Sequence, residues 1–107
     1  MSATRLPLLL VMLLLPLTPA TADALHSYVP KDGFVPNGTV AVAIADAVLT
    51  AIYGNDVIGA ERPLQASLAG DVWTVTGAPP KPGWRGGVAH VEIAKTDGRI
   101  LRVTHGR

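Results

Sequence analysis

The fold is decided by residues 88–105, which read VAHVEIAKTDGRILRVTH. Two runs of alternating apolar and polar residues flank an Asp-Gly pair, and this combination predicts an antiparallel β-hairpin. A two-residue Asp-Gly loop would place Ile93 opposite Arg102, whereas a three-residue loop over 96–98, with Gly98 left-handed, pairs apolar with apolar side chains. We therefore expect these cross-strand pairs: Ile93 with Leu101, Val91 with Val103, Glu92 with Arg102, and His90 with Thr104.

An earlier hairpin is predicted over residues 64–76. Apolar residues at 64, 66 and 68 alternate with Pro63, Gln65 and Ser67, which is typical of a strand with one buried face. Pro63 favours an edge position, because proline cannot donate a hydrogen bond to a neighbouring strand. A two-residue Gly-Asp loop at 70–71 gives these pairs: Leu68 with Trp73, Ala66 with Val75, and Ser67 with Thr74. Trp73 lies in line with Val75 on the apolar face, which predicts a core position rather than a ligand-stacking one.

Residues 37–54 predict the only helix of the domain. Asn37 or Thr39 can cap its first amides, and Gly54 provides a left-handed stop. The side expected to face the core carries Val40, Ile44, Ala47, Val48, Ala51 and Ile52, extended sideways by Val42, Ala45 and Leu49. Because so wide an apolar surface requires cover on more than one side, an N-terminal arm or a second protomer, in a homodimer, is expected to pack on it.

Residues 23–36 contain two prolines and a glycine, which disfavour a helix. They are interpreted as an extended arm that covers a sheet edge through Tyr28, Val29, Phe34 and Val35, with a frayed terminus as the alternative. Residues 55–61 are interpreted as an irregular link. Together the elements predict an α+β fold in one small domain at 23–107, with one helix packed on an antiparallel sheet of about four strands in meander order.

Residues 1–22 have the pattern of a secretory signal peptide. Arg5 precedes an apolar run at 8–15, and Ala20-Thr21-Ala22 is a typical cleavage motif. The run is shorter than the roughly 20 residues that a membrane-spanning helix needs, and Pro16 interrupts it. We expect cleavage, no membrane span in the mature protein, and a periplasmic or secreted location.

Charge and cysteine content exclude several classes of function. The chain has nine Lys and Arg against eight Asp and Glu, and removal of Arg5 with the signal balances the two groups. Nucleic-acid binding normally requires a basic excess, so no nucleic-acid partner is expected. The absence of cysteine excludes a thiol nucleophile, a zinc–thiolate site and any disulfide.

The sequence predicts neither a catalytic nor a metal-binding constellation. His90 and Glu92 lie two apart on one strand and point the same way, but the residues opposite them supply no third metal ligand. Alternation places His105 on the other face of the hairpin. The glycines at 83, 86 and 87 precede a strand rather than a helix, which excludes a phosphate-binding loop. The protein is therefore not expected to be an enzyme, to bind a metal or to need a cofactor.

The candidate partner-binding residues lie in two places. The open face of the sheet presents a set of charged and hydroxyl side chains, His90, Glu92, Arg102 and Thr104, with a merely solvated face as the alternative. The segment that joins the two hairpins carries Trp84 beside Arg85. Tryptophan and arginine dominate binding hot spots, so this pair is interpreted as an interface anchor. The alternative is that Trp84 folds back over the mouth of the core.

Over almost its whole mature length the chain resembles a known group of bacterial proteins. The residues that carry the resemblance are 28–30 (YVP), 52–54 (IYG), 72–77 (VWTVTG), 86–93 (GGVAHVEI) and 97–106 (DGRILRVTHG). The group comprises small immunity proteins with a nuclear transport factor 2-like fold from polymorphic toxin systems. The resemblance implies a cystatin-like helix-on-sheet domain that neutralises a cognate toxin by binding it, and it brings no catalytic residues with it.

Three functional hypotheses remain open at this point. The first is an exported immunity-type protein that blocks a toxin by direct binding through Trp84, Arg85 and the open sheet face. The second is a periplasmic modulator, or a small-ligand-binding domain whose cavity lies between helix and sheet. The third is an enzyme that uses His90 and Glu92 as acid and base in such a cavity.

Overall fold

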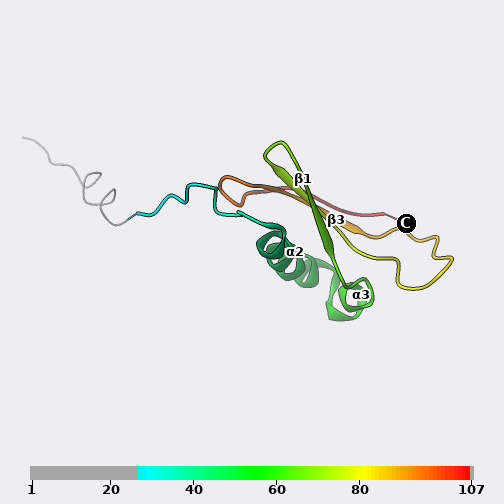
Figure 1. Cartoon of the computed structure of the whole chain (residues 1–107). Coiled ribbons are helices and arrows are strands. Elements are labelled where there is room, and N and C mark those ends of the chain that lie inside the picture. Colours follow the sequence, from blue (N-terminus) through cyan, green and yellow to red (C-terminus); the bar gives the residue numbers. More distant parts are fainter. Residues whose placement is uncertain (1–26, 107) are drawn as a thin grey trace, which may run out of the picture.

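A computed structural model describes residues 27–106 of the chain, so the predicted signal peptide at 1–22 lies outside the described residues. The elements are α2 (Gly38–Tyr53), α3 (Asn55–Ala60), β1 (Gln65–Ala69), β2 (Val72–Thr76), β3 (Ala89–Ala94) and β4 (Ile100–His105). Both helices lie on one side of a four-stranded sheet (Figure 1), which confirms the predicted α+β fold. Within residues 27–106, no helix combines the length and apolarity that a membrane crossing requires.

The sheet has the meander order β1-β2-β3-β4, and its first hairpin has the predicted register. Across the Gly-Asp turn, Leu68 pairs with Trp73, Ser67 with Thr74, and Ala66 with Val75. Gly70 has a φ of 59°, a left-handed value that glycine adopts without strain. The position of β1 at the edge agrees with the expectation from Pro63. β2 then pairs with β3, which sets Val75 opposite Val91 and Thr76 opposite His90.

The second hairpin departs from its predicted register near the turn. His90, Val91 and Glu92 pair as expected with Thr104, Val103 and Arg102, but Ile93 pairs with Ile100 and not with Leu101. The loop has four residues, 95–98, because the N–H of Ala94 donates to the carbonyl of Arg99 at 2.9 Å. Leu101 is then the extra residue of a β-bulge that restores the register. Ile93 is fully buried while Leu101 is 41% exposed, so the three-residue loop and the expected Ile93–Leu101 contact are wrong.

Helix α2 begins and ends as predicted but turns a different side to the sheet. Its buried residues are Ala41, Ala45 and Leu49, whereas Ala47, Ala51 and Ile52 of the predicted core side are exposed. Where α2 meets the sheet, the core includes Leu49 of the helix and Val75, Val91 and Ile93 of the strands, all without solvent exposure. Because nearly every residue of α2 is apolar, the row with two alanines can face the strands, and small side chains there allow close packing.

The N-terminus of α2 is capped by Asn37. Its side-chain oxygen accepts a hydrogen bond from the backbone N–H of Val40 at 3.0 Å. We expect Asn37→Ala to lower the free energy of unfolding by about 1 kcal/mol, because this amide loses its acceptor. Thr39→Ala is the matched control, and it should change the value by less than about 0.5 kcal/mol in the same urea titration. Equal losses in the two variants would contradict the assignment of the cap.

Residues 55–60 form a second short helix, α3, where the sequence analysis expected an irregular link. Its Ile58 is fully buried in the core. Arg62, just beyond α3, donates two hydrogen bonds to the Asp46 carboxylate of α2, from Nε at 2.7 Å and from Nη2 at 2.9 Å. The Arg62 guanidinium holds the pKa of Asp46 below its usual value. The two helices are therefore joined by apolar packing and by this paired contact.

Only the last part of the N-terminal arm packs on the domain. Val35 is fully buried, and its carbonyl accepts the indole N–H of Trp73 at 2.8 Å. The N–H groups of Phe34 and Val35 donate to carbonyls of the turn between β3 and β4, both at 3.0 Å. Tyr28, Val29 and Phe34 are each more than half exposed, so their predicted packing is wrong. Trp73 is 8% exposed, which confirms its predicted core position.

Candidate functional site

The side of the sheet that faces away from the helices carries an open polar pocket. Its volume is about 230 Å³, and its lining residues are Thr74 of β2, His90 and Glu92 of β3, and Arg102 and Thr104 of β4. They gather here because every second side chain of three neighbouring strands projects to the same side. Four of the predicted partner-binding residues are thus brought together in one place.

Few internal contacts hold the polar groups of this pocket. The Thr76 hydroxyl lies 3.1 Å from Nδ1 of His90, which leaves the other ring nitrogen available to a ligand. Arg102 approaches Glu92 with 3.7 Å between Nη1 and Oε2, a separation too long for a hydrogen bond. The Arg102 side chain is 67% exposed, so solvent screens this pair. A cation, an anion and a histidine nitrogen therefore remain open to an incoming molecule.

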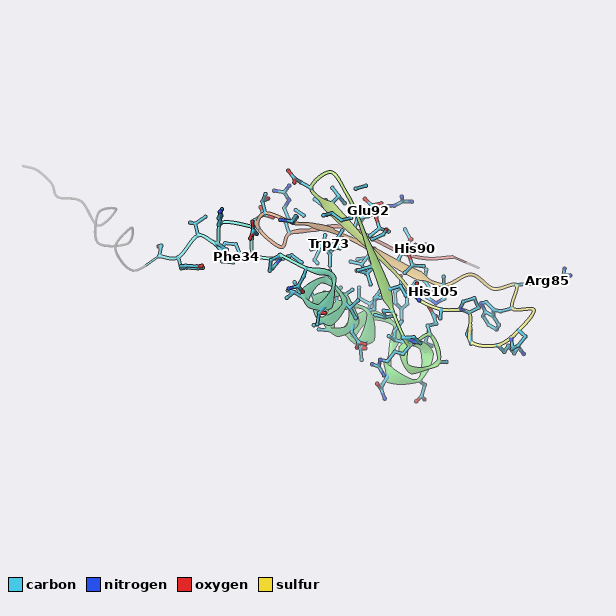
Figure 2. The ribbon with its side chains drawn as sticks, in the orientation of Figure 1. Phe34, Trp73, Arg85, His90, Glu92 and His105 are labelled. Atoms are coloured by element: carbon cyan, nitrogen blue, oxygen red, sulfur yellow. The ribbon has the colours of Figure 1, made fainter. Side chains whose placement is uncertain are left out.

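Trp84 and Arg85 do not line this pocket. They lie on the segment of residues 77–88 between β2 and β3, and Arg85 projects from it, away from His90 and Glu92 (Figure 2). Trp84 packs on its own segment, where its indole N–H donates to the Gly87 carbonyl at 2.7 Å. The Lys81 ammonium lies 5.9 Å from its ring centre. With 40% of its surface exposed, Trp84 is a half-exposed ring that its own loop holds in place, and it does not cover the core.

The shortest ion pair among the described residues lies on the helix side of the sheet, and it was not predicted from the sequence. Glu61, just after α3, is 2% exposed. One of its carboxylate oxygens accepts the backbone N–H of Ala89 at 2.8 Å. The other lies 2.6 Å from Nε2 of His105, at the end of β4. The ring of Tyr53, from α2, lies 5.0 Å from the ring of His105, centre to centre.

The surroundings of His105 favour its charged form. While Nε2 faces Glu61, Nδ1 lies 3.0 Å from the carbonyl oxygen of Gly106. Both neighbours can accept a hydrogen bond, and the imidazolium, which carries hydrogen on both ring nitrogens, satisfies both of them. The hydrogen bond to Glu61 raises the pKa of His105 above its ordinary value and outweighs the opposing effect of desolvation. With both nitrogens engaged, His105 is part of an ion pair and is not a free catalytic base.

Gly77 makes room for the Glu61 carboxylate. A Cβ atom at position 77 would overlap Oε1 of Glu61, although the backbone conformation of Gly77 is one that other residues also adopt. The glycine is thus required by the close approach of another side chain. This requirement ties the end of β2 to the same buried carboxylate as β3 and β4.

The open pocket and the 77–88 segment both offer groups suited to molecular recognition. Among residues 27–106, no three His, Asp or Glu side chains gather closely enough to hold a metal ion. The open pocket offers groups that form charge-assisted hydrogen bonds, and these are the stronger and more directional kind. The 77–88 segment offers a separate aromatic and cationic contact.

Comparisons with known proteins identify the family. Over 73 residues the chain is 34% identical to the "Uncharacterized protein YhhH" of Escherichia coli (strain K12), an alignment that covers 68% of this chain. The chain spans 58% of the length of that relative. No solved structure matches the chain at a significant level. The sequence model of the NTF2 fold immunity proteins matches residues 40–107, which is more than half of the chain, and the protein therefore belongs to the NTF2 fold immunity protein family.

Proposed function

We propose that the protein neutralises a cognate toxin by direct, non-catalytic binding, and that it does so outside the cytoplasm. Membership of the immunity protein family supports an immunity-type role. The binding mode is supported by the pocket on the side of the sheet that faces away from the helices. A surface that combines both signs of charge with hydroxyl groups selects a partner by electrostatic complementarity.

The pocket supplies recognition groups of different chemistry within one small area. The Arg102 guanidinium can hold a carboxylate of the partner through two parallel hydrogen bonds, and the Glu92 carboxylate can accept from a partner lysine or arginine. Trp84 and Arg85 add a second contact of hot-spot composition, on the segment that extends beyond the sheet (Figure 2). We infer that the pocket fixes the orientation of the toxin and that the segment extends the interface.

The proposed location rests on the sequence of residues 1–22, with their apolar run and cleavage motif. Because an immunity protein must meet its toxin, export implies a toxin that acts in the periplasm or outside the cell. Residues 1–24 fused to an alkaline phosphatase that is active only after export should give periplasmic activity. A fusion that stays in the cytoplasm would contradict the proposed location.

Co-expression with the toxin encoded in the adjacent reading frame tests neutralisation and its surface together. The wild-type protein should restore growth, whereas Arg102→Glu should weaken toxin binding about 10-fold or more, because it reverses the charge in the pocket. Arg99→Glu is the matched control: the Arg99 side chain is 68% exposed against 67% for Arg102, but it lies outside the pocket. A toxin that kills equally well with and without the wild-type protein would refute neutralisation. Equal binding by the two variants would refute the pocket as the contact.

A small-ligand-binding or modulator role is the second candidate, and the pocket of about 230 Å³ is the observation that favours it. The interior between α2 and the sheet is filled by Leu49, Val75, Val91 and Ile93. A hollow lined by Gly38, Thr39, Val42 and Ala66 lies at the border of α2 and β1, but the open-face pocket is the one with charged lining groups for a polar ligand. A polar ligand bound there would raise the melting temperature without any toxin. An enzymatic role would use His90 and Glu92 in the same pocket, and replacing both with glutamine would abolish it.

A further inference from the structure

Glu61 fastens both ends of the 77–88 segment. At its start, the N–H of Ala78 donates to the backbone carbonyl of Glu61 at 2.7 Å. At its end, the N–H of Ala89 donates to the Glu61 carboxylate at 2.8 Å. The two ends are also joined to each other, because Gly77 donates to the carbonyl of Ala89 at 2.9 Å. Both ends of the segment that carries Trp84 and Arg85 are therefore hydrogen-bonded to the same buried residue, Glu61.

The contact that holds Glu61 in this position depends on a charge. Its second carboxylate oxygen faces His105 at 2.6 Å, and the His105 side chain is 20% exposed. Among the described residues, the titratable group that α2 contributes against His105 is Tyr53. The ends of β2 and β3 bring Gly77 and Ala89, which carry no charge. His105 is thus the cation that balances the buried carboxylate.

We propose that the Glu61–His105 ion pair holds the 77–88 segment in place while His105 is charged, and that deprotonation of His105 releases the segment. Neutral His105 has one N–H for two acceptors, so one of its two bonds must be lost. The buried carboxylate also loses its counter-ion, which makes its burial unfavourable. Glu61 and His105 are positioning residues in this account. This control of the segment needs no toxin and lies beyond the proposed function, because it concerns how the segment with Trp84 and Arg85 is kept rigid.

The direction of the pH dependence follows from the raised pKa of His105. A group whose folded pKa lies above its unfolded value contributes stability below the unfolded pKa and loses that contribution as pH rises through the folded pKa. The ordinary value is 6.5. The segment is therefore held fully below about pH 6.5, and it is released as pH rises through the raised pKa of His105.

Amide hydrogen exchange measured by NMR tests the inference on the full-length mature protein. The protection factors of the Ala78 and Ala89 amides should fall about 10-fold as His105, followed by its own ring resonances, deprotonates. Amides at the centre of the β2–β3 ladder should keep their protection. Tryptic cleavage after Arg85, normalised to a free peptide of residues 77–88 at each pH, should accelerate over the same range.

Three variants separate the ion pair from other titrating groups. His105→Gln should give low protection of Ala78 and Ala89 at every pH, and His105→Lys should keep it high through the range in which histidine loses its proton. His90→Gln, on the open face, is the matched control and should leave the profile of the wild-type protein unchanged. The proposal would be overturned if the protection of Ala78 and Ala89 in the wild-type protein did not follow the titration of His105. It would also be overturned if His105→Lys lost this protection over the same pH range as the wild-type protein. The wild-type and His90→Gln profiles decide the matter if a variant at position 105 does not fold.

Discussion

Leu49→Ala is expected to lower the free energy of unfolding by about 2–5 kcal/mol, because it truncates a fully buried core side chain. Leu49 of α2 is among the largest fully buried side chains, and it belongs to one core cluster with Val75 and Ile93 of the strands. Truncation removes its apolar contacts and leaves a cavity that a packed sheet cannot close.

The matched control for Leu49 lies three residues further along the same helix. Ile52 is 55% exposed, so Ile52→Ala should change the free energy of unfolding by about 0.5 kcal/mol or less, partly because alanine favours the helix. Urea denaturation followed by circular dichroism measures both values. A larger loss for Ile52→Ala than for Leu49→Ala would show that the side of α2 expected from the sequence faces the core after all.

Glu61→Ala is expected to destabilise the protein by about 3–5 kcal/mol at pH 6, because it breaks a buried ion pair by removing one partner. Two contacts disappear together, since the carboxylate binds the Ala89 N–H and faces the His105 ring at the same time. The loss should shrink as pH rises above the pKa of His105, because the wild-type protein then loses the same ion pair.

Urea titrations of the wild type and Glu61→Ala at pH 6 and pH 9 measure this effect. Glu92→Ala is the matched control, because Glu92 pairs with Arg102 on the open face of the sheet, where solvent screens the charges. Its effect should stay below about 1 kcal/mol at both pH values. A pH-independent loss in Glu61→Ala would show that the ion pair with His105 does not contribute to stability.

The first hairpin could be predicted residue by residue because its turn is short. Two residues, Gly70 and Asp71, leave a single way to pair the flanking strands, and apolar alternation selected the same pairing. The second hairpin has no such constraint. Its four-residue loop and the bulge at Leu101 compensate for each other, so Glu92 still meets Arg102 although the residues near the turn are displaced.

The buried side of α2 could not be predicted from its periodicity. Periodicity locates the core side only when polar residues mark the opposite side, and in α2 the residues around the whole helix are largely apolar. Ala41 and Ala45 face the strands because small side chains fit the close approach of helix and sheet, a property of the tertiary structure rather than of the helix itself.

The residues of the open-face pocket could be predicted from strand alternation, because the register of the strands alone decides which side chains share a face. The buried pair did not, because Glu61 and His105 are 44 residues apart and meet only when α3 and the end of β4 are packed together. One signal was present in the sequence: alternation placed His105 on the core side of β4, where a histidine requires a partner. Its partner could not be named, because Glu61 belongs to a stretch that was expected to be irregular.

The bulge at Leu101 has a consequence for how copies of the protein meet one another. β4 is an outer strand of the described sheet, and exposed outer strands invite pairing with strands of other molecules. The additional residue bends the strand, so a straight incoming strand can follow it regularly only over residues 102–105. Growth of the sheet by addition of further strands along this edge is thereby discouraged.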